Sequence, residues 1–330
     1  MRVKRTTIQD LADFCGLSKS TVAYILREPD TCKATAATKA KVASAVSKLN
    51  YRPNPAARAL STRRYRSIGV LFPPRGGYYN ELMVQLDKEM RKHNYYGIFS
   101  FWELDELDGH GKNSSKRSFQ KLCDHGIDGV ITTEYSDFFK KSNIPVVIYG
   151  NEWPSFDCVF PDKVAYMKDT VKYLLNHGHQ NIGFLGLTNE LRAKTLRKEL
   201  TSNNLPVNED WFINTSATLE NGKGAMLKLL SQKKHPDAVI LHSDSLMPGV
   251  LCAADSLGIR VPEDISIISY DNLSRSELFI PPLTTFDPCL PLVAEMLMEV
   301  MLKRIEKPEM PFQKKSFKMR LIERKSVKYK

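Results

Sequence analysis

The chain has 330 residues, of which 42% are hydrophobic and 26% charged, a composition typical of an ordinary globular protein and not of a disordered one. The sequence contains no run of 18 apolar residues, and no apolar segment follows its basic N-terminus, so we expect neither a transmembrane helix nor a secretory signal. The six cysteines are far apart and form no C-x-x-C pair, which predicts reduced thiols in a cytosolic protein rather than disulfides or a zinc site.

Charge is unevenly distributed along the chain. Residues 1–66 contain 14 Lys and Arg against four Asp and Glu, whereas residues 67–311 contain 26 against 32. A basic head on a mildly acidic body is typical of a small polyanion-binding domain attached to a second unit. A solubilising basic arm would have the same charge. The residue pattern within the head must therefore distinguish such an arm from a polyanion-binding domain.

The head predicts three short helices. Apolar residues at helical spacing follow Thr7, a good N-cap, and Gly16 can end this helix with a positive φ. Ser18 is the expected cap of a second helix, and Thr35 precedes a third. Two helices joined by a short glycine-containing turn form the helix-turn-helix arrangement, which predicts a DNA-binding head.

The second helix is expected to present its first turn to the major groove. Among its outward residues, Lys19 can donate to base edges, and Ser20 and Tyr24 can bond either a base edge or a phosphate. Ser18 and Thr21, near the helix N-terminus, are better placed for phosphate. A solvated surface helix is the alternative interpretation.

Three segments of the head carry a family resemblance. They are residues 7–12 (TIQDLA), 16–22 (GLSKSTV) and 49–54 (LNYRPN). Together they resemble the DNA-binding head of the lac repressor (LacI/GalR) family. With Thr7, the five residues of the second helix named above form the DNA-binding set expected in the head.

A very short helix is predicted after the head. Asn54 can cap it and Pro55 suits its first position, but a helix of about two turns is marginal in water. In the family that the chain resembles, this segment is a hinge helix that folds on the operator and pairs with its dimer mate. The resemblance implies that Ala57 and Arg58 contact the minor groove and that Leu60 wedges between base pairs. A plain linker is the alternative.

Beyond residue 66, short apolar strands alternate with amphipathic helices. This pattern predicts an α/β body of parallel sheets covered on both faces, and its length favours two doubly wound lobes with a ligand cleft between them. The expected strands span residues 68–72, 129–132, 146–149, 182–187, 238–241 and 265–269.

The family resemblance covers nearly the whole chain and is strongest at residues 257–272 and 281–285. It implies a two-lobed body similar to periplasmic sugar-binding proteins, with three chain crossings between the lobes. We therefore expect a helix-turn-helix head, a hinge helix with linker, and an effector-binding and dimerisation domain, at residues 1–53, 54–66 and 67–330. Lobe 1 is expected near residues 67–160 and 290–319, and lobe 2 near residues 161–289 and 320–330.

The resemblance carries over the effector cleft only in part. It implies that Tyr78 and Tyr79 are ligand-touching aromatics, and that Arg192, Asp162 and Asp244 bond the effector. Arginine and carboxylates make charge-assisted bonds to sugar hydroxyls or carboxylates, which fits these roles. Ordinary loop charges are the alternative.

The identity of the effector is not readable from the sequence. Ala217 stands where purine-binding members of the family stack an aromatic ring, and Ser243 replaces the asparagine of the family's N-D pair. A sugar or sugar derivative is the family's commonest effector. Trp153 and Trp102 could stack on one, although packing is the expected role of each.

Other classes of protein fit less well. A periplasmic binding protein would need a signal peptide, and an enzyme would need a convergent catalytic set, whereas the seven histidines show no metal spacing and no cofactor motif is present. We expect a cytoplasmic, nucleoid-associated, homodimeric repressor that binds a palindromic operator and is controlled by a sugar-like effector. A DNA-binding regulator with a ligand-blind body that only dimerises remains the open alternative.

Overall fold

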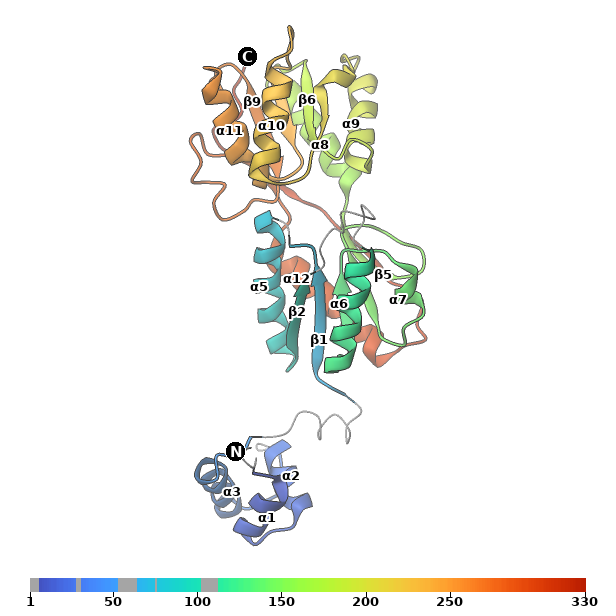
Figure 1. Cartoon of the computed structure of the whole chain (residues 1–330), viewed down its shortest axis with the longest axis vertical. Coiled ribbons are helices and arrows are strands. Elements are labelled where there is room, and N and C mark those ends of the chain that lie inside the picture. Colours follow the sequence, from blue (N-terminus) through green and yellow to red (C-terminus); the bar gives the residue numbers. More distant parts are fainter. Residues whose placement is uncertain (1–5, 28–30, 53–63, 75, 102–111) are drawn as a thin grey trace. The chain divides into compact units, whose positions relative to one another are not determined.

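The computed structural model describes residues 6–27, 31–52, 64–74, 76–101 and 112–330. The chain divides into two compact units, residues 1–65 and residues 66–330 (Figure 1). The DNA-binding residues expected in the hinge lie outside the described residues; they are Asn54, Ala57, Arg58 and Leu60. Trp102 also lies outside them. No helix in the described part of the chain is long and apolar enough to cross a membrane.

The first unit consists of three helices, α1 (Ile8–Cys15), α2 (Lys19–Arg27) and α3 (Ala36–Lys48). The caps are those that the sequence predicts. Thr7 forms a capping box with Asp10, and Gly16 ends α1 with φ 58°. Ser18 accepts a hydrogen bond from the Thr21 amide at 3.1 Å. The small core beneath includes Leu11, Ala12, Cys15, Val22, Ile25, Val42, Ala45 and Tyr51.

Two six-stranded sheets form the second unit. The first has the order β11-β5-β4-β3-β1-β2 and the second β12-β10-β9-β8-β6-β7. All pairs are parallel except β10–β12. The strands are β1 (Ser67–Phe72), β2 (Tyr96–Phe101), β3 (Gly129–Thr132), β4 (Val146–Tyr149), β5 (Asp157–Pro161), β6 (Ile182–Gly186), β7 (Phe212–Asn214), β8 (Ala238–Leu241), β9 (Ser266–Tyr270), β10 (Thr284–Asp287), β11 (Lys314–Phe317) and β12 (Arg320–Ile322).

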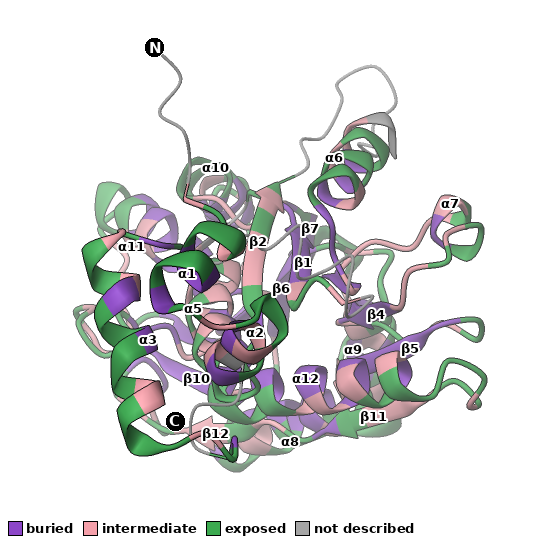
Figure 2. Ribbon diagram, turned by 90° about the horizontal axis from the view of Figure 1, so that it is seen from below, coloured by how far each residue is buried: buried purple, intermediate pink, exposed green. Residues whose placement is uncertain are grey.

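Helices cover both faces of each sheet. In the first lobe α5 and α12 pack on one face, and α6 and α7 on the other. In the second lobe α8 and α9 share one core, and α10 and α11 the other. The strands are largely buried and the helices expose their outer faces (Figure 2). The helices are α5 (Gly76–Lys92), α6 (Lys112–His125), α7 (Asp137–Lys140), α8 (Lys163–Asn176), α9 (Leu191–Ser202), α10 (Leu219–Leu230), α11 (Met247–Ser256) and α12 (Leu290–Glu306), with 3-10 turns η1 (Glu209–Trp211) and η2 (Asp244–Leu246).

The predicted fold class, a three-helix head followed by a two-lobed α/β body of parallel sheets, is confirmed. The number of strands is not, because β2, β5, β7, β10, β11 and β12 were not expected. The expected strand at 182–187 ends one residue earlier, at Gly186, and the one at 265–269 is shifted to Ser266–Tyr270.

The chain passes between the lobes three times. The crossings follow β5, β10 and β11, at residues 161–163, 287–290 and 317–320. The Asp162 amide donates to the Phe317 carbonyl at 2.8 Å, so the first and third crossings lie side by side. In the second crossing Cys289 has φ 56°, and its amide donates to Asp287 at 2.8 Å.

Candidate nucleic-acid interface and ligand cleft

Helix α2 exposes the residues that the sequence assigns to DNA. Lys19 and Ser20 are exposed, and Tyr24 is 39% exposed, whereas Val22 and Ile25 on the opposite side are buried in the head core. A helix with one buried face presents the other face as a unit. The arrangement places an ammonium and two hydroxyl groups on the outer surface of a basic domain, which suits base edges and phosphates.

The N-termini of α1 and α2 carry the hydroxyl groups proposed to contact phosphate. The Ser18 and Thr21 hydroxyls lie 2.8 Å apart and are hydrogen-bonded to each other. Thr7 is exposed and donates its hydroxyl to Asp10 at 2.8 Å. Helix N-termini bind phosphate through free backbone N–H groups.

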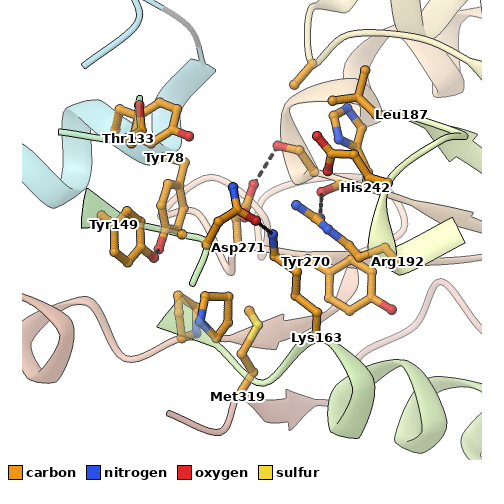
Figure 3. A pocket seen from close by; sticks show the side chains of 18 of the residues that line it. Tyr78, Thr133, Tyr149, Lys163, Leu187, Arg192, His242, Tyr270, Asp271 and Met319 are labelled. Carbon is orange, nitrogen blue, oxygen red and sulfur yellow. Dashed lines mark hydrogen bonds between the residues drawn. The ribbon is translucent and has the colours of Figure 1, made fainter. Parts of the chain in front are cut away.

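A cavity of about 260 Å³ lies between the two lobes of the second unit (Figure 3). Its lining comes largely from the carboxyl ends of parallel strands, where open α/β sheets bind ligands. Tyr149 ends β4 and Tyr270 ends β9, while His242 and Ser243 directly follow β8. The first helix of lobe 1, α5, contributes Tyr78 and Tyr79.

Arg192, on the first turn of α9, reaches into this cleft from lobe 2. Its guanidinium donates to the His242 carbonyl at 2.6 Å and lies 5.8 Å from the centre of the Tyr270 ring. Burial and the charge of Arg192 lower the pKa of the His242 imidazole to about 3, so this ring is neutral. Its Nε2 is buried with no partner among the described residues.

Lys163 is a second cation in the cleft. It is the first residue of α8, and its Nζ donates to Asn151 Oδ1 at 2.6 Å. Burial and the positive charge of Arg192 lower the pKa of Lys163 to about 8. The ammonium therefore keeps its proton at neutral pH, although less firmly than an exposed lysine.

Tyrosines form one wall of the cleft. The Tyr78 and Tyr149 hydroxyls are hydrogen-bonded to each other, and their rings stack with centroids 6.2 Å apart. The Tyr79 ring packs edge-on against the Tyr78 ring, with the ring centroids 5.5 Å apart. Burial, reinforced for Tyr78 by its Tyr149 neighbour, raises the pKa of both hydroxyls well above the usual range. They are therefore neutral hydrogen-bonding groups.

Two of the predicted effector residues do not line the cleft. Asp244 is fully buried behind it and accepts hydrogen bonds from the Leu273 amide at 3.1 Å and from the Ser276 and Thr285 hydroxyls. Asp162 caps α8 by accepting from the Ala165 amide at 2.9 Å, and it is the neighbouring Lys163 that faces the cavity.

Besides the exposed Glu190, the cleft is lined by the carboxyl group of Asp271, which was not among the effector residues expected from the sequence. It follows β9 with φ 116°, a conformation that is uncommon outside glycine and that accumulates at functional sites. The Ser243 hydroxyl donates to its Oδ2 at 2.5 Å. Burial and the adjacent Asp244 raise the pKa of Asp271 well above its usual range. A polar residue after a predicted strand was the available signal.

One of the seven histidines and one of the tryptophans have structural roles. His177 is the C-cap of α8, and Trp153 stacks on Tyr135 with centroids 4.1 Å apart. Ala217 does line the cleft. Among the residues that the structure describes, no group of His, Cys, Asp and Glu is arranged to hold a metal ion.

Comparison with known proteins matches both units. Residues 7–54 match the model of the bacterial regulatory proteins of the lacI family, and residues 171–327 match a periplasmic binding protein-like domain. The chain is 30% identical over 342 residues to the HTH-type transcriptional repressor PurR of Photorhabdus laumondii, covering 97% of this chain and 96% of that protein. The PurR of Serratia proteamaculans matches with the same identity and coverage.

Solved structures share the fold. The lac repressor dimer bound to operator and the anti-inducer ONPF superposes with a TM-score of 0.84 at 21% identity, covering 98% of this chain and 100% of that one. A LacI family regulator from Enterococcus faecium with bound ribose gives a TM-score of 0.69 at 24% identity, covering 80% of this chain and 99% of that one.

Proposed function

Because the chain belongs to the LacI family of bacterial regulatory proteins, we propose that it is a repressor that binds a palindromic operator as a homodimer under the control of a small-molecule effector. It is a DNA-binding transcription regulator and not an enzyme. We place it in the cytoplasm, associated with the nucleoid.

The observation that carries the DNA-binding proposal is the exposed first turn of α2 on a basic head. Lys19, Ser20 and Tyr24 are assigned to base edges, and Thr7, Ser18 and Thr21 to phosphates. The exposure of Lys19, Ser20 and Tyr24 on the side of α2 opposite the buried Val22 and Ile25 supports the assignment of this face. Asn54, Ala57, Arg58 and Leu60 are assigned to DNA by family analogy, the last three to the minor groove, with residues 54–66 as the hinge and linker.

The effector is assigned to the interlobe cleft. Tyr78, Tyr79 and Arg192 line the cavity and are proposed to contact the effector directly. Asp244 and Asp162 are proposed to act through their neighbours, since Asp244 adjoins Asp271 and Asp162 caps the helix that begins with Lys163. A change in lobe closure on effector binding would alter the separation of the two hinges of the dimer and so the affinity for the operator.

The proposal is tested by selecting genomic fragments with the full-length protein and sequencing those retained. A recurrent palindrome is expected, with half-sites spaced for a symmetric dimer. The Lys19→Ala variant should relax the preference at particular positions of each half-site. Retention of fragments without a common sequence would contradict a sequence-specific repressor.

A further inference from the structure

Among the described residues, no carboxylate forms an ion pair with either cation of the cleft, although Glu190 is close enough for its charge to favour the protonated form of both. Neither Arg192 nor Lys163 forms an ion pair with any described residue; their hydrogen bonds go to the His242 carbonyl and the Asn151 amide oxygen. Both side chains extend into the same space from the first turns of α9 and α8 (Figure 3). Unpaired positive charge in a partly dehydrated cavity is costly unless a counter-charge enters.

The nearby carboxyl groups of Asp271 and Glu190 act on Arg192 electrostatically but form no ion pair with it. Asp244 receives hydrogen bonds from three donors and is the better site for the negative charge of the adjacent pair. Burial and the charge of Asp244 raise the pKa of Asp271, whereas the hydrogen bond from Ser243 and the charge of Arg192 lower it, so Asp271 is the weaker of the two sites for negative charge. Glu190 lies in the lining but is solvent-exposed, so water weakens its effect on Arg192.

Hydrogen-bond donors therefore dominate the cleft. Besides the two cations, one hydroxyl of the Tyr78–Tyr149 pair can donate to an occupant, because the hydrogen bond between these two neutral groups uses only one of their two protons. The cavity of about 260 Å³ is below the usual range of roughly 300–1,000 Å³ for drug-sized ligands, which limits the occupant to about one ring. Tyrosine rings in its wall suit the face of such a ring.

We propose that the effector is an anion, a compound of about one ring whose phosphate or carboxylate oxygens lie between Arg192 and Lys163. The inference rests on the proposed function and specifies the chemistry of its effector. Arginine and lysine both make charge-assisted bonds to oxyanions, and arginine does so in a bidentate manner. Its remaining guanidinium N–H groups have no partner among the described residues, so they are available for this purpose.

The test measures unfolding of the full-length protein in inorganic phosphate, in acetate and in chloride at one ionic strength, followed by tryptophan fluorescence. Glucose 6-phosphate, glucuronate and glucose extend the comparison to one-ring compounds. The variants are Arg192→Met and Lys163→Met, with Lys168→Met as a matched control because Lys168 is exposed on the same helix as Lys163. Far-UV circular dichroism checks that each variant is folded, so that failure of one leaves the other informative.

We expect an oxyanion to raise the Tm of the wild type and of Lys168→Met by a few degrees, and each cleft variant to weaken its apparent Kd about tenfold or more. A response to phosphate and glucose 6-phosphate identifies a phosphorylated effector, and a response to acetate and glucuronate a carboxylate. Equal shifts in the cleft variants, no shift with any oxyanion, or tighter binding of glucose than of its charged derivatives would overturn the inference. Operator binding is measured separately on the same proteins, and it tests the proposed repressor function independently of the effector.

Discussion

Asp244 provides a quantitative test of how the cleft is built. The Asp244→Ala substitution removes the acceptor for the Leu273 amide and for the Ser276 and Thr285 hydroxyls. Each buried donor left without a partner costs about 1–3 kcal/mol, and local relaxation reduces the sum. We expect a loss of about 3–5 kcal/mol in the free energy of unfolding. At about 2–4 °C per kcal/mol for a domain of this size, the Tm falls by roughly 10 °C.

Tryptophan fluorescence is a suitable assay because Trp102, Trp153 and Trp211 all belong to the second unit and the first unit has no tryptophan. Asp255→Ala is the matched control, since Asp255 is exposed on α11, and it should change stability by less than about 0.5 kcal/mol. If Asp244→Ala keeps the wild-type Tm and loses only effector binding, Asp244 contacts the effector directly and the reasoning from its hydrogen bonds is wrong.

Four further predictions concern DNA and effector. Operator affinity should fall by about 10³–10⁵ between 50 and 200 mM salt if the head makes six to ten phosphate contacts, and a flat titration would contradict it. Measured by fluorescence anisotropy, Lys19→Ala should reduce the free energy of operator binding by about 1–3 kcal/mol and alter the sequence preference. Thr21→Ala should weaken binding to all DNA sequences alike. Leu60→Ala should reduce operator affinity and the DNA bend, seen by gel mobility, while calorimetry finds effector affinity retained. Since the pKa of Lys163 is about 8, oxyanion affinity should hold below pH 8 and fall about tenfold by pH 9 as the ammonium deprotonates; Lys163→Met should remove this dependence.

The sequence predicts the interior strands much better than the edges of the sheets. The expected strands at 129–132, 146–149 and 238–241 coincide with β3, β4 and β8, because a strand covered on both faces is a continuous apolar run. All four edge strands, β2, β7, β11 and β12, were missed. Edge strands are short or partly exposed, as in β11 with its two lysines, so no apolar run marks them. The interior β10 was missed because its buried threonines look polar in sequence.

The cleft was predictable in position but not in the direction of its side chains. Strand ends locate it, and Tyr78, Tyr79 and Arg192 line it as expected. Spacing cannot distinguish Asp244, which turns into the protein to meet three donors, from Asp271, which a positive φ turns into the cavity. Those directions depend on contacts between segments about 30 residues or more apart in the chain.

The three crossings between the lobes have a mechanical consequence. Two lobes joined by a single connection can rotate about several axes relative to each other. Here short connections lie side by side, held by the Asp162–Phe317 hydrogen bond, and they restrict the lobes to rotation about one axis. Lobe movement is then described by nearly one angle. A single distance between spectroscopic labels, placed for example at the exposed Lys88 of α5 and Lys223 of α10, should report that angle. Plotted against this distance, the operator affinities measured with different effectors should fall on one curve.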